Sequence, residues 1–269
     1  MIEEKAIVLT GASSGIGRAT ALLLAGEHAR MLLVARRGER LASLKEEVRD
    51  LGGVAFTATL DLSHREDVET MVSEAIKNLG RIDVLINNAA FGYFGTVEHT
   101  PPELVREIFA LNFEAPLIAT QLAIPIMRRQ GSGHIINVSS VAGKRGLPLS
   151  GIYSATKFAL NGLAESLRVE LKDSNILVST INPAGTRTEF GKAIRVGDVR
   201  GNFKPLGHSQ SAEEVARSIV RCIDNPKLEV YPYWAGRIFA WASTLAPSLV
   251  DAIVLRFFRA RMQARKNGV

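Results

Sequence analysis

The sequence predicts an α/β fold, a doubly wound parallel sheet flanked by helices, in a single domain with a C-terminal helical extension. Three observations lead to this prediction. Short apolar runs alternate with longer stretches of helical periodicity, as in βαβ units. Several runs are apolar at consecutive positions, which is typical of parallel strands buried on both faces. A glycine-rich turn joins the first apolar run to the first helical stretch.

Six strands are expected along the chain, at residues 6–9, 31–35, 54–59, 84–87, 135–138 and 177–181. Helices are expected between them, near residues 16–28, 38–51, 64–79, 101–130 and 152–173. Right-handed crossovers would place these helices on both faces of the sheet. Residues 185–211 are polar and only weakly periodic, which predicts a loop over a binding site.

The composition excludes several classes of protein. The chain has 269 residues, of which 46% are apolar and 22% charged, unlike disordered or collagen-like chains. The one cysteine, Cys222, permits no intrachain disulfide and is typical of a reducing compartment. The first strand begins by Ala6, so we expect a cytoplasmic protein without a signal peptide. The five histidines show no ligand spacing, so no metal site is expected.

The positive charge is concentrated at the C-terminal end. The formal net charge is +6, and residues 236–269 contain six basic residues against Asp251 alone. The rest of the chain is therefore nearly neutral. A nucleic-acid-binding face should spread basic residues over a motif or groove, and the sequence shows neither, so no nucleic acid partner is expected.

Residues 231–269 form an aromatic and basic extension that follows the α/β pattern expected at residues 1–230. Seven of the seventeen aromatic residues, including both tryptophans, lie at 231–258. Pro247 and several polar residues interrupt the apolar stretch, which disfavours a membrane-spanning helix and favours two shorter amphipathic helices. They could cover the pocket entrance, pack across a subunit interface, or lie on an anionic membrane. The extension could be part of the same domain or a peripheral appendage.

The glycine-rich turn at residues 10–17 has the sequence TGASSGIG. Its first glycine permits a tight turn, its second lets backbone N–H groups approach a ligand, and its third lets the helix pack closely on the sheet. The N-terminus of that helix offers unpaired N–H groups to a pyrophosphate. A plain glycine-rich turn is the alternative. The context predicts a Rossmann-type dinucleotide site at Gly11, Ser13, Ser14, Gly15, Ile16 and Gly17.

Two arginines follow the second expected strand. An NAD-selective site would place Asp or Glu there to accept a hydrogen bond from the ribose 2′-hydroxyl, but this chain has Arg36 and Arg37. Guanidinium groups can pair closely with a 2′-phosphate. The pair therefore predicts NADP(H) rather than NAD(H), with Arg36 as the first contact of the phosphate and Arg37 as the second, unless the arginines merely begin a solvated helix.

A tyrosine and a lysine lie four residues apart on the helix expected at 152–173. Tyr153 and Lys157 therefore share one face, and a nearby ammonium lowers the pKa of a phenol from about 10. Ser140 follows the strand at 135–138, at the edge where doubly wound sheets bind ligands. The three residues predict hydride transfer with one proton: Ser140 donates to a carbonyl oxygen, and Tyr153 is the acid or base. Taken alone, the Tyr–Lys pair could be a solvated pair on the helix surface, and Ser140 could belong to a plain turn after the strand.

The sequence resembles the classical branch of the short-chain dehydrogenase/reductase family. The resemblance rests on the glycine turn, on NNAA at 87–90, on Ser140 and on YSATK at 153–157, and it extends over roughly residues 5–230. Two positions depart from the family pattern. Ala90 replaces the usual glycine, and Ala184 follows Pro183 where the family usually has glycine.

The resemblance implies roles for further residues. Asn112 would join the catalytic set by supporting a water-linked proton relay, with a packing role as its alternative. Lys157 would also hold the nicotinamide ribose beside Tyr153, and Thr188 would bond the nicotinamide carboxamide. Asp61 would flank the adenine, although it could instead cap the helix at 64–79. Further cofactor contacts are implied at Leu62, Asn88, Ala89, Pro183, Gly185 and Thr186.

These residues together predict an NADP(H)-dependent oxidoreductase that transfers hydride between nicotinamide and a carbonyl or alcohol. The resemblance implies a homodimer or homotetramer through the helices near 101–130 and 152–173. The alternative is a non-catalytic nucleotide-sensing or membrane-recruited scaffold. A lipophilic small-molecule substrate is expected because apolar side chains should surround the pocket. These are Phe91, Tyr93, Phe94, Leu147, Leu149, Phe190 and Phe203.

Overall fold

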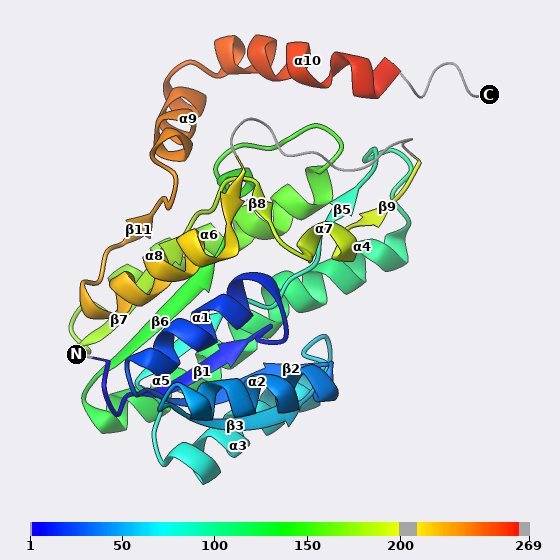
Figure 1. Ribbon diagram of the computed structural model, residues 1–269. Coiled ribbons are helices and arrows are strands. Elements are labelled where there is room, and N and C mark those ends of the chain that lie inside the picture. Colours follow the sequence, from blue (N-terminus) through cyan, green and yellow to red (C-terminus); the bar gives the residue numbers. More distant parts are fainter. Residues whose placement is uncertain (1, 199–208, 264–269) are drawn as a thin grey trace.

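A seven-stranded parallel sheet forms the centre of the molecule, with strand order β11-β7-β6-β4-β1-β2-β3 (Figure 1). The computed structural model describes residues 2–198 and 209–263. The fold class predicted from the sequence is confirmed. The strands are β1 (Ala6–Thr10), β2 (Arg30–Ala35), β3 (Val54–Thr59), β4 (Val84–Asn87), β6 (Gly133–Val138), β7 (Ile176–Ile181) and β11 (Glu229–Val230). The seventh strand, β11, has only two residues and was not predicted, because so short a run shows no periodicity.

Helices cover both faces of the sheet, and each face has its own buried apolar cluster. On one face lie α1 (Gly15–Gly26), α2 (Gly38–Asp50) and α8 (Ala212–Asp224). On the other lie α3 (Arg65–Leu79), α5 (Ala115–Gln130) and α6 (Gly151–Glu170). The side chains of the central strands β1, β2, β4 and β6 are buried on both faces, which explains their consecutive apolar positions.

The helix expected at 101–130 is interrupted by a wider turn. It consists of α4 (Pro102–Phe109), a π-helical turn η1 (Ala110–Glu114) and α5. By length and composition alone this stretch could cross a membrane. However, Ala119, Ala123 and Met127 of α5 belong to the buried cluster that α3 and the sheet share. The α5 part of the stretch therefore packs in the core.

The strand order places the binding crevice. It reverses between β1 and β4, and doubly wound sheets bind ligands at such a switch point, beyond the carboxyl ends of the strands. Short elements surround this edge: β5 (Tyr93–Phe94) pairs with β9 (Arg195–Val196), and β8 (Thr186–Arg187) pairs with β10 (Gln210–Ser211). The loop expected at 185–211 thus contains β8, β9, β10 and α7 (Phe190–Ala193). Phe203 lies outside the described residues.

The C-terminal extension forms two helices that meet at Pro247, as predicted. Helices α9 (Trp234–Leu245) and α10 (Pro247–Gln263) lie at the end of the molecule opposite α2 and α3 (Figure 1). Val250, Val254 and Phe258 of α10 are buried against Phe94 and Leu149. Asp251 also forms an ion pair with Arg145, in the segment that precedes α6. The extension therefore packs on the loops that surround the crevice.

Candidate active site

A cavity of about 920 Å³ opens at the carboxyl ends of the strands around β1, β4 and β6. All of the predicted site residues line it except Gly17 and Asn112. Its walls come from the glycine turn, from the segments after β2, β3, β4 and β6, and from the residues before α7. Residues of α9 and α10 close it on the far side. The sequence had left open whether the extension would cover the pocket, and in the structure it does.

The glycine turn has the shape that a dinucleotide requires. Gly11 and Gly15 have φ values of +67° and +54°, which L-residues with a Cβ rarely adopt. A Cβ on Gly17 would lie 2.2 Å from the carbonyl oxygen of Gly11, so only glycine lets α1 pack this closely. The residues therefore fit a pyrophosphate at the N-terminus of α1.

Asn88 and Ala89 fix the opposite side of the turn. Both donate their backbone N–H groups to Thr10 Oγ1, at 2.9 and 3.0 Å. The Asn88 amide also donates to the carbonyl oxygen of Thr10 at 2.9 Å. A Cβ on Gly11 would lie 2.9 Å from Ala89 Cα, so the end of β4 closes directly on the turn. These residues shape the cavity by joining β1 to β4.

Arg37 connects the glycine turn to the start of α2. Its guanidinium donates to Ser13 Oγ at 3.0 Å and to Ser14 Oγ at 2.6 Å. It also pairs with Glu189 at 3.2 Å. Arg40, one helical turn further along, pairs with the same carboxylate. Neither Arg40 nor Glu189 was predicted; the i,i+3 spacing from Arg37 could have indicated Arg40, but Glu189 is 152 residues from Arg37 in the chain.

Asp61 lies beside the first of the two arginines. Its Oδ2 accepts from Arg36 at 3.4 Å, and its Oδ1 accepts from the N–H and hydroxyl of Ser63 at 3.1 and 2.7 Å. Partial burial opposes ionisation, but the Ser63 hydrogen bonds and the Arg36 charge together lower the pKa of Asp61. The alternative that Asp61 caps the following helix is wrong, because His64 occupies the N-cap position of α3.

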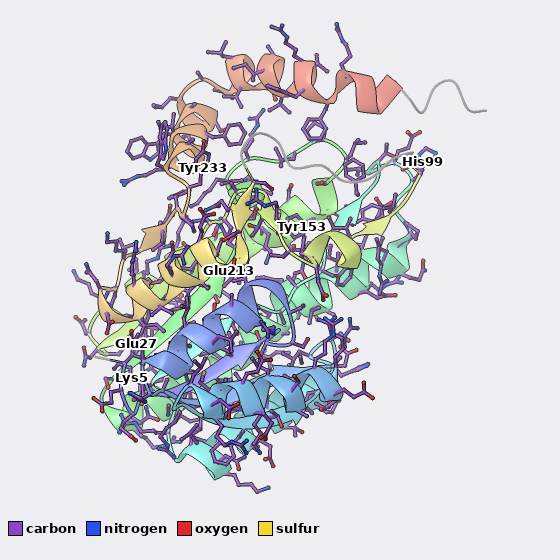
Figure 2. All side chains as sticks on the ribbon, viewed as in Figure 1. Lys5, Glu27, His99, Tyr153, Glu213 and Tyr233 are labelled. Carbon is purple, nitrogen blue, oxygen red and sulfur yellow. The ribbon has the colours of Figure 1, made fainter. Side chains whose placement is uncertain are left out.

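The residues predicted for proton transfer meet at the inner end of the cavity. Tyr153 and Lys157 lie one turn apart on α6, and the Lys157 Nζ is 5.8 Å from the centroid of the Tyr153 ring. Ser140, directly after β6, shares a hydrogen bond with the Tyr153 hydroxyl and accepts from the Ala142 N–H at 3.0 Å. Figure 2 shows Tyr153 inside the molecule, between the sheet and the C-terminal helices. A carbonyl placed there would meet two hydroxyl groups.

Burial shifts the pKa values of both groups toward their neutral forms. It raises the pKa of Tyr153 to about 12, which the Ser140 hydrogen bond offsets in part, so the lowered phenol pKa expected from the nearby ammonium is wrong. It lowers the pKa of Lys157 to about 8. The Lys157 ammonium is also held in place, because it donates to the carbonyl oxygen of Val138 at 2.9 Å. At neutral pH the site therefore contains a protonated phenol beside a cation that is close to losing its charge.

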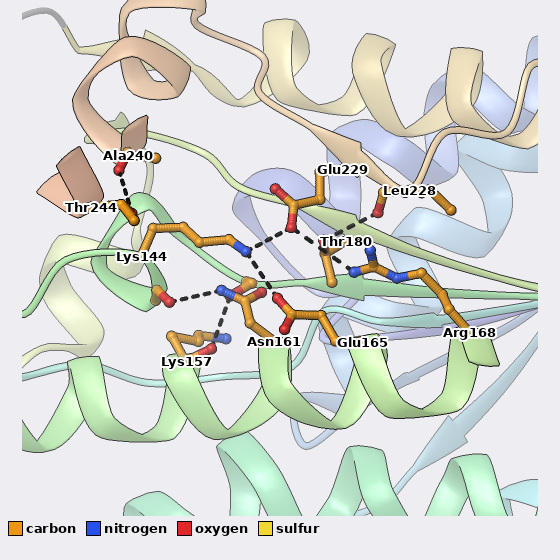
Figure 3. A network of polar contacts seen from close by, with 12 residues as sticks. Lys144, Lys157, Asn161, Glu165, Arg168, Thr180, Leu228, Glu229, Ala240 and Thr244 are labelled. Carbon is orange, nitrogen blue, oxygen red and sulfur yellow. Dashed lines mark hydrogen bonds and ion pairs between the residues drawn. The ribbon is translucent and has the colours of Figure 1, made fainter. Parts of the chain in front are cut away.

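A network of ions and amides holds the loop after Ser140 (Figure 3). Lys144 pairs with Glu229 at 2.6 Å and with Glu165 at 3.3 Å, which links this loop to β11 and α6. The amide of Asn161, one turn beyond Lys157 on α6, donates to the Gly143 carbonyl oxygen at 2.9 Å. None of these residues was predicted from the sequence, because their roles depend on contacts between distant segments.

Asn112 acts from behind the cavity. It lies in the π-helical turn η1, is buried, and exchanges two hydrogen bonds with the backbone of Phe91, at 2.9 and 3.0 Å. Its amide also donates to Thr156 Oγ1 at 3.2 Å. Asn112 thus joins the segment after β4 to α6, next to Lys157. Its packing role is visible, and its part in a proton relay stays a prediction.

The segment after β7 forms the remaining wall. The Pro183 carbonyl oxygen accepts from the Val141 N–H at 3.0 Å, and the Ala184 N–H donates to Gln210 Oε1 at 3.0 Å. Gln210 is buried and was not predicted. Thr188 Oγ1 accepts from the Phe190 N–H at 3.1 Å and lies against Gly15 across the cavity. The segment therefore closes over the glycine turn.

Apolar side chains line the end of the cavity beyond Tyr153. The Phe190 ring lies 5.9 Å from that of Tyr153, between ring centroids. Phe91, Tyr93 and Leu147 also line the cavity, as predicted. Phe94 and Leu149 do not line it; they pack beneath α10 instead, because β5 turns Phe94 toward the extension. The extension contributes Phe239, Val254 and Phe257, among others.

Known proteins resemble this chain over most of its length. Residues 5–198 match the family model of the short chain dehydrogenases. The chain is 32% identical over 280 residues to Dehydrogenase/reductase SDR family member 7B of Danio rerio, covering 99% of this chain and 89% of that protein. It is 31% identical over 258 residues to uncharacterized oxidoreductase YxnA of Bacillus subtilis, covering 94% and 72% respectively.

Solved structures show the same architecture. A short chain dehydrogenase/reductase from Burkholderia phymatum in complex with NAD has a TM-score of 0.83 and 25% identity, and the match covers 92% of this chain and 95% of that one. A metagenomic short-chain oxidoreductase in complex with NADP has a TM-score of 0.73 and 30% identity, covering 86% and 98%. With the geometry of the cavity, these matches show that the chain belongs to the short-chain dehydrogenase/reductase family of oxidoreductases.

Proposed function

We propose that the protein is an NADP(H)-dependent oxidoreductase that interconverts a lipophilic carbonyl compound and its alcohol. The observation that carries this proposal is the meeting of Ser140, Tyr153 and Lys157 at the inner end of the cavity. Burying the Lys157 amine and the Tyr153 hydroxyl lowers the stability of the fold. A non-catalytic protein would have no need for this arrangement, whereas a catalytic role explains why both groups are buried together.

The three residues divide the work of one proton transfer. A bound nicotinamide would supply the hydride in reduction and accept it in oxidation. The Ser140 hydroxyl donates a hydrogen bond to the carbonyl oxygen as negative charge develops there. Tyr153 gives its proton to that oxygen in reduction and removes the alcohol proton in oxidation. The Lys157 ammonium stabilises the phenolate that remains on Tyr153.

The reduction rate should depend on the charge of Lys157. The pKa of Tyr153 is about 12, so its proton is present throughout the neutral range, whereas Lys157 loses its charge as pH rises through about 8. We expect kcat/KM for reduction to be level below about pH 7 and to fall about tenfold per pH unit well above 8. The K157M variant should be slow and lack this fall. A flat profile for the unmodified enzyme would contradict the role of Lys157.

The cofactor phosphate would bind at the mouth of the cavity. Arg36, Arg37 and Arg40 gather there, and a 2′-phosphate pairs well with guanidinium groups. Relatives of known structure bind NAD or NADP, so this arginine cluster is what supports NADP(H) here. In the structure, Glu189 pairs with both Arg37 and Arg40. A bound 2′-phosphate would therefore have to displace this carboxylate or share the arginines with it.

Replacing Glu189 with glutamine should favour NADPH. Its hydrogen bonds and ion pairs with Arg40 and Arg37 lower the pKa of Glu189, so it is ionised at neutral pH and competes with the phosphate. We expect the Kd of NADPH to fall about three- to tenfold and that of NADH to change little. The E39Q variant, which removes the same charge from the exposed face of α2, is the matched control. Equal changes for both cofactors would contradict the competition.

The apolar end of the cavity supports a lipophilic substrate. Phe91, Phe190, Phe239 and Phe257 line it, and they come from four separate segments of the chain. NADPH consumption should be followed with aldehydes and ketones of graded chain length. We expect kcat/KM to rise with chain length, because each buried methylene contributes about 0.8 kcal/mol. An absence of turnover with every carbonyl compound would contradict the proposed reaction.

The assembly and location follow the same proposal. We expect a homodimer or homotetramer through α4, α5 and α6, and the exposed Phe158 and Val169 of α6 support this surface. Residues 1–230 would form the NADP-binding catalytic part, and residues 231–269 an extension that covers the substrate. We place the enzyme in the cytoplasm, where a single buried thiol such as Cys222 stays reduced.

A further inference from the structure

The outer face of α9 carries an exposed apolar stripe. Trp234, Ile238, Trp241 and Leu245 follow one another at intervals of three or four residues, so they lie on one side of the helix. Their exposed fractions are large, for example 68% for Trp234, 58% for Trp241 and 85% for Leu245. We call these four residues the α9 stripe. Contiguous exposed apolar surface of this kind marks an interaction site.

The stripe is not the result of a loosely attached helix. Gly236 and Ala240, on the inner side of α9, are buried or packed, and a Cβ on Gly236 would lie 2.9 Å from Val141 of the loop after Ser140. Phe239 packs with Val250 of α10 in the cluster beneath the extension. The inner side of α9 therefore packs against the rest of the protein, and the outer side is available to a partner.

Positive charge accompanies the stripe. The Arg237 guanidinium lies 4.6 Å from the centroid of the Trp241 ring, on the same face of α9. Helix α10 adds the exposed Leu249 and carries Arg256 and Arg259. The acid of these helices, Asp251, is paired with Arg145 of the catalytic part. The surface therefore combines tryptophan, aliphatic and arginine side chains with one neutralised carboxylate.

This combination fits a bilayer better than a second copy of the chain. In a twofold contact the same patch would face itself, so the arginines of the two copies would repel one another. At an anionic membrane the arginines meet phosphate and carboxylate groups, and tryptophan rings prefer the depth of the headgroups. Apolar side chains on one face of a helix then insert into the headgroup and acyl boundary.

We propose that the α9 stripe and its arginines dock the enzyme on an anionic phospholipid surface. The docking does not depend on the reaction that the enzyme performs. It would bring the side of the cavity that the extension forms close to the bilayer, because Phe239 of α9 and Phe257 of α10 line the cavity on that side. Entry of a lipophilic substrate from the bilayer into the cavity would require, in addition, that the proposed function is correct.

The chain provides its own probe for this proposal. Both tryptophans of the chain are in the α9 stripe, so tryptophan fluorescence reports on this surface. The full-length protein should be titrated with phosphatidylcholine vesicles that contain or lack phosphatidylserine. We expect a blue shift and cosedimentation with the anionic vesicles, about tenfold stronger than with the neutral ones and weakened by salt.

Two matched variants locate the contact. L245E places a charge in the α9 stripe and keeps both tryptophans. L51E makes the same change at an exposed leucine directly after α2, a helix that lies at the opposite end of the molecule from α9 (Figure 1). L245E should lower vesicle affinity about tenfold or more, whereas L51E should not. Both should unfold at the temperature of the unmodified protein, since both positions are exposed.

Three results would overturn the proposal. The first is a fluorescence that does not respond to anionic vesicles. The second is an equal loss of vesicle binding in L245E and L51E. The third is a blue shift that depends on protein concentration without vesicles, together with a doubled mass by light scattering that L245E abolishes. This last result would assign the stripe to a second copy of the chain. None of them involves turnover, so the docking and the proposed reaction fail separately.

Discussion

Replacing Tyr153 with phenylalanine should lower kcat for carbonyl reduction by about a thousandfold. The substitution removes the hydroxyl that shares a hydrogen bond with Ser140 and leaves the ring in its packing against Phe190. Since burial raises the pKa of Tyr153 to about 12, the phenol holds its proton until the reacting oxygen takes it, and a phenylalanine ring has none to give. Steady-state reduction at neutral pH measures the loss.

The cofactor and a second phenol provide the controls. Y153F should bind NADPH with nearly unchanged affinity in a fluorescence titration, because the glycine turn and the arginines are intact. Y93F removes another phenol that lines the same cavity, and its effect should be at least about a hundredfold smaller. Normal turnover by Y153F, or equal losses in both variants, would refute the assignment of the acid.

Replacing Arg37 with aspartate should raise the KM for NADPH about a hundredfold and change that for NADH far less. A carboxylate would face the 2′-phosphate, and like charges at such a contact cost several kcal/mol, each 1.4 kcal/mol being about tenfold. Arg37 is the critical member of the arginine cluster because it bonds to both Ser13 and Ser14 of the glycine turn. The ratio of kcat/KM for the two cofactors is the measurement.

Two further substitutions separate charge from loop structure. R36D should shift the ratio less, because the Arg36 side chain is more exposed and reaches toward Asp61 rather than the glycine turn. R37Q removes the charge without reversing it and should lie between R37D and the unmodified enzyme. If R37D weakens both cofactors equally, Arg37 supports the turn and does not select the phosphate.

Local sequence patterns were sufficient to predict the sheet and the centre of the site. The glycine turn and the Tyr153–Lys157 pair each depend on short-range geometry, a strand-to-helix turn and one helical turn, which the sequence shows directly. The order of the strands then brings Ser140 to the same edge. Predicting the glycine turn and the Tyr153–Lys157 pair did not require knowledge of distant contacts.

The missed features depend on segments that meet only in the folded chain. Glu189 reaches Arg37 across 152 residues, and Gln210 reaches Ala184 from a separate short strand. Lys144 pairs with Glu229 from a strand of two residues that has no visible pattern. Phe94 was assigned to the pocket, yet it supports α10, because neighbouring residues of a strand point to opposite sides.

At the π-helical turn of residues 110–114, the number of residues is as important as their type. A π-helical turn amounts to one extra residue in a regular α-helix, and each residue of an α-helix advances the face by about 100°. Deleting one residue there would restore an even pitch and rotate α4 out of phase with α5. Asn112 would then move away from the backbone of Phe91, and the segment after β4 would lose the two hydrogen bonds that hold it. Point substitutions are therefore a gentler perturbation here than a single-residue deletion.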